Sequence, residues 1–302
     1  MTIKISAIVC TYNRKAFLTR CLDSLLNQNY HDYEVIVVDD GSTDGTPQFV
    51  NEYKKKNPTH MTFRYIQHKR NRGLGVARNT AVKNAFGMVV AFTDDDCVVS
   101  RDWVANIARY HFNYPEVAAV GGLVFNGCAD NVIAEIGQQM VTYLLYDKMI
   151  DDQYTNFLVG NNQSYKKEVI EQVQYFEGGL IYGGEDAEIQ SRLIGRGYKM
   201  IFSSDITVTH FQRSTFKSFL KQYYRYGIGE YVVYLKNRYN DDLYKSRFKS
   251  NIIQRIVRPI KRPYEVSKYL EKRREKILCY PFVYLASVAR AMGFIAAKFG
   301  VM

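Results

Sequence analysis

Residues 88–96 read Met88-Val89-Val90-Ala91-Phe92-Thr93-Asp94-Asp95-Asp96. The apolar part of this segment is typical of a strand buried at the centre of a sheet. Its acidic end should lie at the carboxyl edge of that sheet, where open α/β folds bind their ligands. Three adjacent carboxylates repel one another unless they share a cation, and divalent cations that bridge to phosphates take such oxygen ligands. We therefore interpret the acidic triplet as part of a metal site; the alternative is a solvated acidic turn.

The segments before the triplet alternate between strand and helix patterns. Strands are predicted at residues 5–9, 34–38, 62–66 and 88–93. Helices are predicted at residues 17–26, from 43–47 onward, and at 76–85. Repeated β-α units with short connections predict an α/β fold, with a mostly parallel sheet covered by helices on both faces.

The alternation changes after the triplet. Further helices are predicted at residues 103–112, 132–149 and 187–194, and further strands at 117–125 and 206–209. Beyond His210 the chain is predicted to be mainly helical. We expect a catalytic domain at residues 1–212, with a nucleotide-binding half at 1–97 and an acceptor half at 98–212. A helical, basic region at 213–302 should follow it.

The charge of the chain is unevenly distributed. The 302 residues carry a net charge of +11, and residues 213–276 alone contain 18 Lys and Arg against 6 Asp and Glu. A basic segment of this kind suits an anionic surface, either lipid head groups or nucleic acid. The five cysteines are scattered without a C-x-x-C pair, which argues against a zinc site and a disulfide framework. The N-terminus lacks the pattern of a secretory signal, so we expect cytosolic residence.

Residues 277–299 are apolar for most of their length, but Pro281, Arg290 and Lys298 interrupt them. A central arginine is costly in a membrane-spanning helix. The preceding basic cluster, Lys272-Arg273-Arg274, is typical of a helix that lies in the membrane interface. We therefore rank an interfacial helix first, a buried core or oligomer-contact helix second, and a spanning helix third.

Candidate nucleotide-binding residues follow the first two predicted strands. We assign this role to Thr11, Tyr12 and Asn13 after the first strand and to Asp40 after the second. The Tyr12 ring can stack on a base, and the Asp40 carboxylate can accept the N–H groups of a uracil or a guanine. Arg78 lies early in the next helix, where it can neutralise a diphosphate or brace the aspartates. For each residue alone, the alternative is an ordinary structural role.

Candidate catalytic and pocket residues lie further along the chain. Gly183-Gly184-Glu185-Asp186 opens a helix, where acids are also favoured by the helix dipole alone. If an acceptor hydroxyl binds there, Asp186 is the natural general base. His210 ends a predicted strand and can join Asp96 on the metal. The candidates for the acceptor or donor pocket are Asn161, Asn162, Glu185 and Arg225.

Five segments in this order resemble the family 2 glycosyltransferases with the GT-A fold. They are Ala7–Arg14, Val37–Ser42, Asn71–Gly73, Thr93–Asp96 and Gly184–Asp186. The resemblance covers about the first 210 residues and implies an inverting transferase that uses a nucleotide-diphosphate sugar and Mn²⁺ or Mg²⁺. Carried over by position, the Tyr12 region and Asp40 hold the base, and Asp94 and Asp95 help to hold the nucleotide. Asp96 then binds the metal, and Asp186 is the catalytic base.

Residues 222–227 are similar to the Q-x-x-R-W motif of processive members, with Tyr226 in place of tryptophan. Because the multiple spanning helices of those polymerases are absent, we expect transfer of single sugars. The donor would be a UDP, GDP or dTDP sugar, and the acceptor a glycan or lipid-linked molecule in polysaccharide, glycolipid or other glycoconjugate synthesis. We expect a peripheral enzyme on the inner face of the cell membrane, which binds no nucleic acid and can form oligomers.

Two other functions compete with this interpretation. A sugar-phosphate nucleotidylyltransferase shares a similar sheet, but carries a glycine-rich loop with Arg and Lys after its first strand, where this chain has Thr11-Tyr12-Asn13-Arg14. A nucleic-acid-binding protein would use the basic region and show steeply salt-dependent affinity. That alternative leaves the acidic triplet unexplained.

Overall fold

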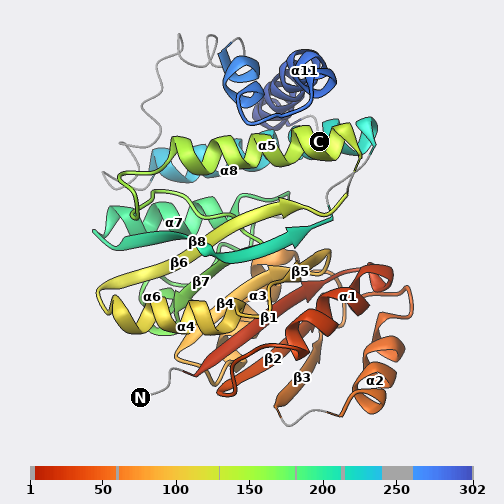
Figure 1. Cartoon of the computed structure of the whole chain (residues 1–302), viewed down its shortest axis with the longest axis vertical. Helices are drawn as coiled ribbons and strands as arrows, with labels where there is room; N and C mark the ends of the chain where they lie inside the picture. Colours follow the sequence, from red (N-terminus) through yellow and green to blue (C-terminus); the bar gives the residue numbers. More distant parts are fainter. Residues whose placement is uncertain are drawn as a thin grey trace.

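A computed structural model describes residues 4–58, 61–128, 130–180, 182–211, 215–239 and 261–300. Eight strands form one sheet in the order β3-β2-β1-β4-β7-β6-β8-β5. Figure 1 shows the sheet in the middle of the molecule, with helices packed on both of its faces and a further helical layer at the C-terminal end. The α/β fold with helices on both faces is confirmed.

The N-terminal half contains the predicted β-α units. The strands are β1 (Ile5–Thr11), β2 (Tyr33–Asp39), β3 (Thr62–Gln67) and β4 (Val89–Asp94). The helices between them are α1 (Lys15–Leu26), α2 (Thr46–Lys56) and α3 (Leu74–Asn84). The neighbouring strands pair in parallel. All four carboxyl ends therefore lie at one edge of the sheet, as the sequence predicted.

The second half makes the sheet mixed. Its strands are β5 (Cys97–Val99), β6 (Val117–Asn126), β7 (Gln163–Lys166) and β8 (Lys199–His210). Its helices are α4 (Trp103–Asn113), α5 (Val132–Asp147), α6 (Lys167–Gln172) and α7 (Glu185–Gly195). β7 pairs antiparallel with β4 and β6, while β6 and β8 are parallel. The sequence patterns did not indicate β5, β7 or α6.

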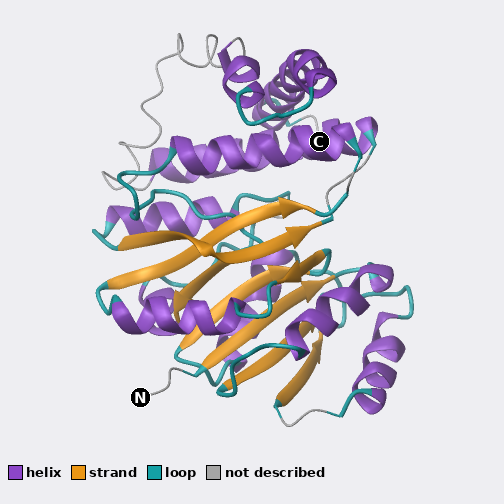
Figure 2. Ribbon diagram, viewed as in Figure 1, coloured by secondary structure: helices purple, strands orange, loops and turns teal. Residues whose placement is uncertain are grey.

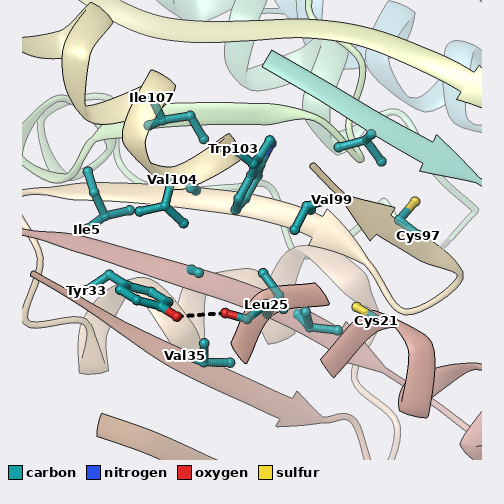
Figure 3. Packing of buried hydrophobic residues seen from close by; sticks show 14 of the residues in the cluster. Ile5, Cys21, Leu25, Tyr33, Val35, Cys97, Val99, Trp103, Val104 and Ile107 are labelled. Carbon is teal, nitrogen blue, oxygen red and sulfur yellow. Dashed lines mark hydrogen bonds between the residues drawn. The ribbon is translucent and has the colours of Figure 1, made fainter. Parts of the chain in front are cut away.

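The core lies on both faces of the sheet because successive side chains of a strand point to opposite sides. In β1, Ile5, Ala7 and Val9 contact the cluster that includes Trp103, whereas Ile8 contacts the cluster on the other face. Figure 3 shows the first cluster, in which the Tyr33 hydroxyl donates a hydrogen bond of 2.9 Å to the Leu25 carbonyl oxygen. Burial on both faces accounts for the nearly continuous apolar sequences of the central strands.

The C-terminal helices form a layer of their own. They are α8 (Phe216–Tyr239) and α11 (Arg273–Lys298), with a shorter helical segment at 261–267. They enclose a third apolar cluster together with α5. Figure 2 shows these helices stacked beyond the orange strands of the sheet. Part of the predicted basic region, residues 213–214 and 240–260, lies outside the described residues.

Candidate active site at the carboxyl edge of the sheet

Strand register brings the first loop of the chain to the acidic triplet. Cys10 in β1 lies opposite Asp94 in β4. One residue further, the Thr11 hydroxyl donates a hydrogen bond of 2.7 Å to Asp95 Oδ2. Thr11 is buried, and its hydrogen bond helps to fix the position of this carboxylate. The structure therefore brings together Thr11 and Asp95, which the sequence analysis had placed in the same site.

Arg14 pairs with two aspartates of the triplet and was not among the predicted site residues. Its Nε lies 2.9 Å from Asp95 Oδ1, and its Nη2 donates a hydrogen bond to Asp96 Oδ2. The guanidinium also lies 4.6 Å from the centre of the Phe17 ring. Arg14 follows the candidate nucleotide-binding residues directly in sequence. That neighbourhood was the one available signal for its role, because nothing in the sequence fixes the direction of its side chain.

His210 reaches Asp96 because of the pairing between β5 and β8. Their register places Cys97 opposite His210, and His210 Nε2 lies 3.3 Å from Asp96 Oδ1. Burial by itself would raise the pKa of Asp96, but the His210 hydrogen bond and the charges of His210 and Arg14 lower it to about 2. Asp96 is therefore an ionised carboxylate at neutral pH. Burial raises the pKa of Cys97 well above its usual value, so it stays a thiol.

The donor set at Asp96 fits a divalent cation. Ligand atoms of Asp96, Cys97 and His210 lie within 4.8 Å of one another. An ionised carboxylate and an imidazole are ligands that manganese-type cations accept. The protonated, buried Cys97 thiol is a poor ligand for such a cation. Asp96 and His210 are accordingly the two residues of this cluster that can hold it.

The other two aspartates of the triplet differ from Asp96. Burial raises the pKa of Asp95 to about 7, although the Arg14 charge opposes this shift. Burial also raises the pKa of Asp94, against the opposing charge of Arg78. Asp96 is thus ionised at neutral pH, whereas the pKa values of Asp94 and Asp95 are raised towards neutrality. This difference in pKa arises from the surroundings of each aspartate, so it could not be predicted from three identical residues in the sequence.

Asp40 holds a loop in place at the tip of β2. Its carboxylate accepts the Gly73 amide at 2.7 Å and the Arg72 amide at 3.0 Å, and it contacts His68 Nδ1 at 2.6 Å. Only 4% of Asp40 is exposed. These contacts fix the loop that leads into α3. The sequence analysis missed His68 and this supporting role.

Tyr12 and Asn13 lie in the loop after β1. Tyr12 is 43% exposed, so its ring is available to a ligand. Asn13 Oδ1 accepts the Thr43 amide at 2.7 Å, and the Ser42 hydroxyl accepts the Asn13 amide at 2.9 Å. The loops after β1 and β2 are therefore tied together.

Arg78 connects the acidic triplet to the Glu185-Asp186 pair. It lies 3.0 Å from Glu185 Oε1, 3.8 Å from Asp94 Oδ1, and donates to the Gly160 carbonyl oxygen at 3.0 Å. Arg78 is 2% exposed. Of the two roles predicted for it, the structure shows the bracing of acids. Burial raises the pKa of Glu185 to about 7, although the Arg78 charge opposes this shift.

Glycines place Asp186 at the start of α7. Gly183 and Gly184 have φ values of +103° and +98°, which side-chain-bearing residues rarely adopt. A Cβ atom at Gly160 would lie 2.7 Å from Asp186 Oδ2, so a side chain there would displace this carboxylate from its present position. Asp186 is partly exposed, and its Oδ1 accepts the Ala187 amide at 2.8 Å.

The remaining pocket candidates occupy different surroundings. Asn162 is fully buried and donates to the carbonyl oxygens of Leu123 and Ile206, while its Oδ1 accepts from Trp103. It supports the sheet and does not line a pocket. Asn161 is 4% exposed, and its Oδ1 has no hydrogen-bond partner among the described residues. Arg225 lies exposed on α8.

Comparisons with known proteins agree with this arrangement. The family model for Glycosyl transferase family 2 matches residues 6–174. A dolichyl N-acetyl-alpha-D-glucosaminyl phosphate 3-beta-D-2,3-diacetamido-2,3-dideoxy-beta-D-glucuronosyltransferase of Methanococcus voltae is 27% identical over 249 residues, which are 78% of this chain and 75% of the relative. The glycosyltransferase AglE of Haloferax volcanii is 26% identical over 242 residues, with the same two coverages.

A solved structure shares the fold along the whole chain. The mannosyltransferase PcManGT of Pyrobaculum calidifontis, solved in complex with GDP-Man and Mn²⁺, superposes with a TM-score of 0.71 at 20% identity. The match covers 100% of this chain and 89% of that one. The family match spans more than half of the chain and includes both the loop after β1 and the acidic triplet. The chain belongs to glycosyl transferase family 2 and is an inverting glycosyltransferase that takes its sugar from a nucleotide-sugar donor.

Proposed function

We propose that this enzyme transfers a single sugar with Asp186 as general base, at a site where Asp96 and His210 hold a divalent cation. The observation that carries the proposal is the Arg78 side chain, which contacts Asp94 of the triplet and Glu185, the residue before Asp186, at once. Because of this contact, a donor bound at the triplet has its sugar next to Asp186. An acceptor hydroxyl that enters from the partly exposed side of Asp186 then meets the anomeric carbon.

The residues suggest the course of the reaction. Asp186 accepts the proton of the acceptor hydroxyl, whose oxygen attacks the anomeric carbon from the face opposite the diphosphate. The configuration at that carbon therefore inverts. When bound, a divalent cation supplies positive charge for the departing diphosphate, so no protein acid is needed. Tyr12 offers an exposed ring on which the donor base can stack.

The metal is expected to be Mn²⁺ in preference to Mg²⁺. Mg²⁺ binds oxygen ligands in near-ideal octahedral geometry, whereas an imidazole nitrogen such as that of His210 is more readily accepted by Mn²⁺. The solved mannosyltransferase of similar fold was also obtained with Mn²⁺. Both facts support the assignment, and the direct comparison of the two ions tests it.

The acceptor is expected to be lipid-linked, on the cytoplasmic face of the membrane. The name of the Methanococcus relative describes transfer to a dolichyl-phosphate-linked sugar. In this chain, α11 is the one described helix that is long and apolar enough to cross a membrane. The apolar residues that α11 exposes fit a helix that lies in the membrane interface.

Ligand-dependent stability tests the metal role of Asp96. We expect UDP or GDP to raise the melting temperature, and Mn²⁺ to increase that shift, because selective binding stabilises the folded state. Asp96→Ala should fold normally and lose the part of the shift that requires Mn²⁺, together with transferase activity. Asp147→Ala, which removes an exposed carboxylate paired with Lys148, is the control and should behave like wild type. An unchanged Mn²⁺-dependent shift in Asp96→Ala would refute the assignment.

A further inference from the structure

Two aspartates of the acidic triplet are paired with a cation that the chain itself provides. Arg14 contacts Asp95 at 2.9 Å and also donates to Asp96. The side chains of Asp95 and Asp96 are 6% and 11% exposed, while that of Arg14 is 32% exposed. The carboxylates are therefore fixed inside the protein, and the guanidinium approaches them from the side that faces solvent.

This contact competes with the metal that the site fits. Arg14 lies on Oδ2 of Asp96, and His210 on Oδ1 of the same carboxylate. A divalent cation held by Asp96 and His210 would lie within a few ångströms of the guanidinium, and like charges at such distances repel strongly in a buried site. The guanidinium and the metal therefore compete for Asp96 in the arrangement that the structure shows.

We propose that Arg14 is the internal counter-ion of the metal-free site, and that it weakens metal binding until a nucleotide diphosphate arrives with the metal. The proposal rests on the metal role proposed for Asp96. Arg14 belongs to the same loop as Tyr12, and its guanidinium rests on the Phe17 ring at 4.6 Å. Once it leaves Asp96, it stays at the mouth of the site, where the donor diphosphate is expected.

The donor phosphates then give Arg14 a replacement partner. A guanidinium binds phosphate oxygens through two parallel hydrogen bonds, so the charge that leaves Asp96 remains paired. Metal and nucleotide should therefore strengthen each other's binding, and this coupling is reciprocal by thermodynamic necessity. Arg14 is thus a positioning residue that makes the metal site respond to the presence of donor.

Direct measurement of Mn²⁺ binding tests the proposal. We expect the electron paramagnetic resonance signal of free Mn²⁺ to show weak binding to wild type alone and tighter binding with UDP or GDP. Arg14→Gln should bind Mn²⁺ on the order of tenfold more tightly without nucleotide, because a charge-assisted contact with the carboxylates is gone. Nucleotide should improve its Mn²⁺ affinity less than it does in wild type.

Arg109→Gln is the matched control. It removes the same charge from α4, where Arg109 Nη2 lies 2.7 Å from Asp205 Oδ2 and both side chains are exposed. Its Mn²⁺ affinity should equal that of wild type. Arg14→Lys keeps the charge but loses the fork that reaches two carboxylates, and should fall between wild type and Arg14→Gln.

Thermal stability provides a readout that does not depend on turnover. Without metal, Arg14→Gln should melt below wild type, because its aspartates have lost their counter-ion. Mn²⁺ should then raise its melting temperature more than it raises that of wild type. Equal or weaker Mn²⁺ binding by folded Arg14→Gln would overturn this proposal alone. Absence of Mn²⁺ binding to wild type even with nucleotide would instead overturn the metal site itself.

Discussion

Asp186 is the residue on which the chemical step depends. Asp186→Asn keeps the shape of the side chain and its contact with the Ala187 amide, but it cannot accept a proton. We expect kcat to fall by about 10²–10⁴, with donor affinity unchanged. Steady-state rates and calorimetric donor binding measure both quantities. Asp205→Asn, which alters a surface carboxylate paired with Arg109, should leave them unchanged. If Asp186→Asn retains wild-type kcat, another base removes the proton.

Glu185 gives the stability of the protein a dependence on pH. Burial raises its pKa from 4.5 to about 7 in the folded state. The folded state therefore holds a proton that the unfolded state has lost between these values, so stability falls as pH rises from about 4.5 to about 7. Glu185→Gln cannot ionise. We expect its loss of unfolding free energy between pH 5 and pH 8 to be smaller than that of wild type by on the order of 1–3 kcal/mol. Urea unfolding at both pH values measures this difference, and equal losses would contradict the prediction.

At the level of single residues, sequence indicated the acids but not their partners. Asp96 and His210 could be paired because each ends a predicted strand, and strand ends gather at one edge. Arg14 could not be assigned, because its role depends on a side-chain direction that only the packed loop determines. The pocket role predicted for Asn162 is wrong. Polar residues near glycines are typical both of pockets and of buried side chains that support the fold. Its three hydrogen bonds show which applies here.

At the level of elements, the turn into α7 determines where Asp186 lies. Gly183→Ala would force a side-chain-bearing residue to a φ of +103°. We expect the free energy of unfolding to fall by about 1 kcal/mol. We also expect kcat to fall, because the relaxed turn displaces Asp186. Gly197→Ala imposes similar strain at a φ of +79°, at the far end of the same helix and with nothing within 4 Å. It should lose comparable stability and keep its kcat. Equal kcat losses in the two variants would show that strain alone, and not the position of Asp186, controls the rate.

The elements that sequence patterns missed owe their structure to their neighbours. β7 reads Gln163-Ser164-Tyr165-Lys166, which has little apolar character. It becomes a strand because it fills the space between β4 and β6, where Phe92 lies opposite Gln163. β5 has three residues, too few for any periodicity, and exists through its pairing with β8. By contrast, the long apolar strands β1, β2 and β4 are determined locally and were predicted.

At the level of the whole molecule, α11 presents an apolar stripe to solvent. The exposed residues of this stripe, which continues one residue beyond the helix, recur every three or four positions: Ile277, Tyr280, Tyr284, Val288, Met292, Ile295 and Phe299. The interrupting Arg290 does not lie on this stripe, because its Nε contacts Glu230 of α8 at 2.8 Å. Arg273, Arg274 and Lys276 are exposed at the start of the helix. An apolar stripe next to exposed cations fits an anionic lipid surface. The sequence predicted an interfacial helix, but the inward pairing of Arg290 required the structure.

Vesicle flotation tests this orientation of the enzyme on the membrane. Wild type should float with vesicles that contain anionic phosphatidylglycerol, and less so in high salt, which screens the cations. The double variant Ile277→Glu/Ile295→Glu should lose at least about tenfold in vesicle affinity, because each buried aliphatic side chain contributes about 1.5–3 kcal/mol. Met88→Glu/Ile150→Glu is the control, because both residues lie outside α11. Met88 and Ile150 are 60% and 63% exposed, close to the 63% and 54% of Ile277 and Ile295. It should float like wild type. If the Ile277→Glu/Ile295→Glu variant also floats like wild type, the membrane assignment is wrong. If light scattering then shows that this variant has changed from dimer to monomer, the stripe contacts a second copy of the chain.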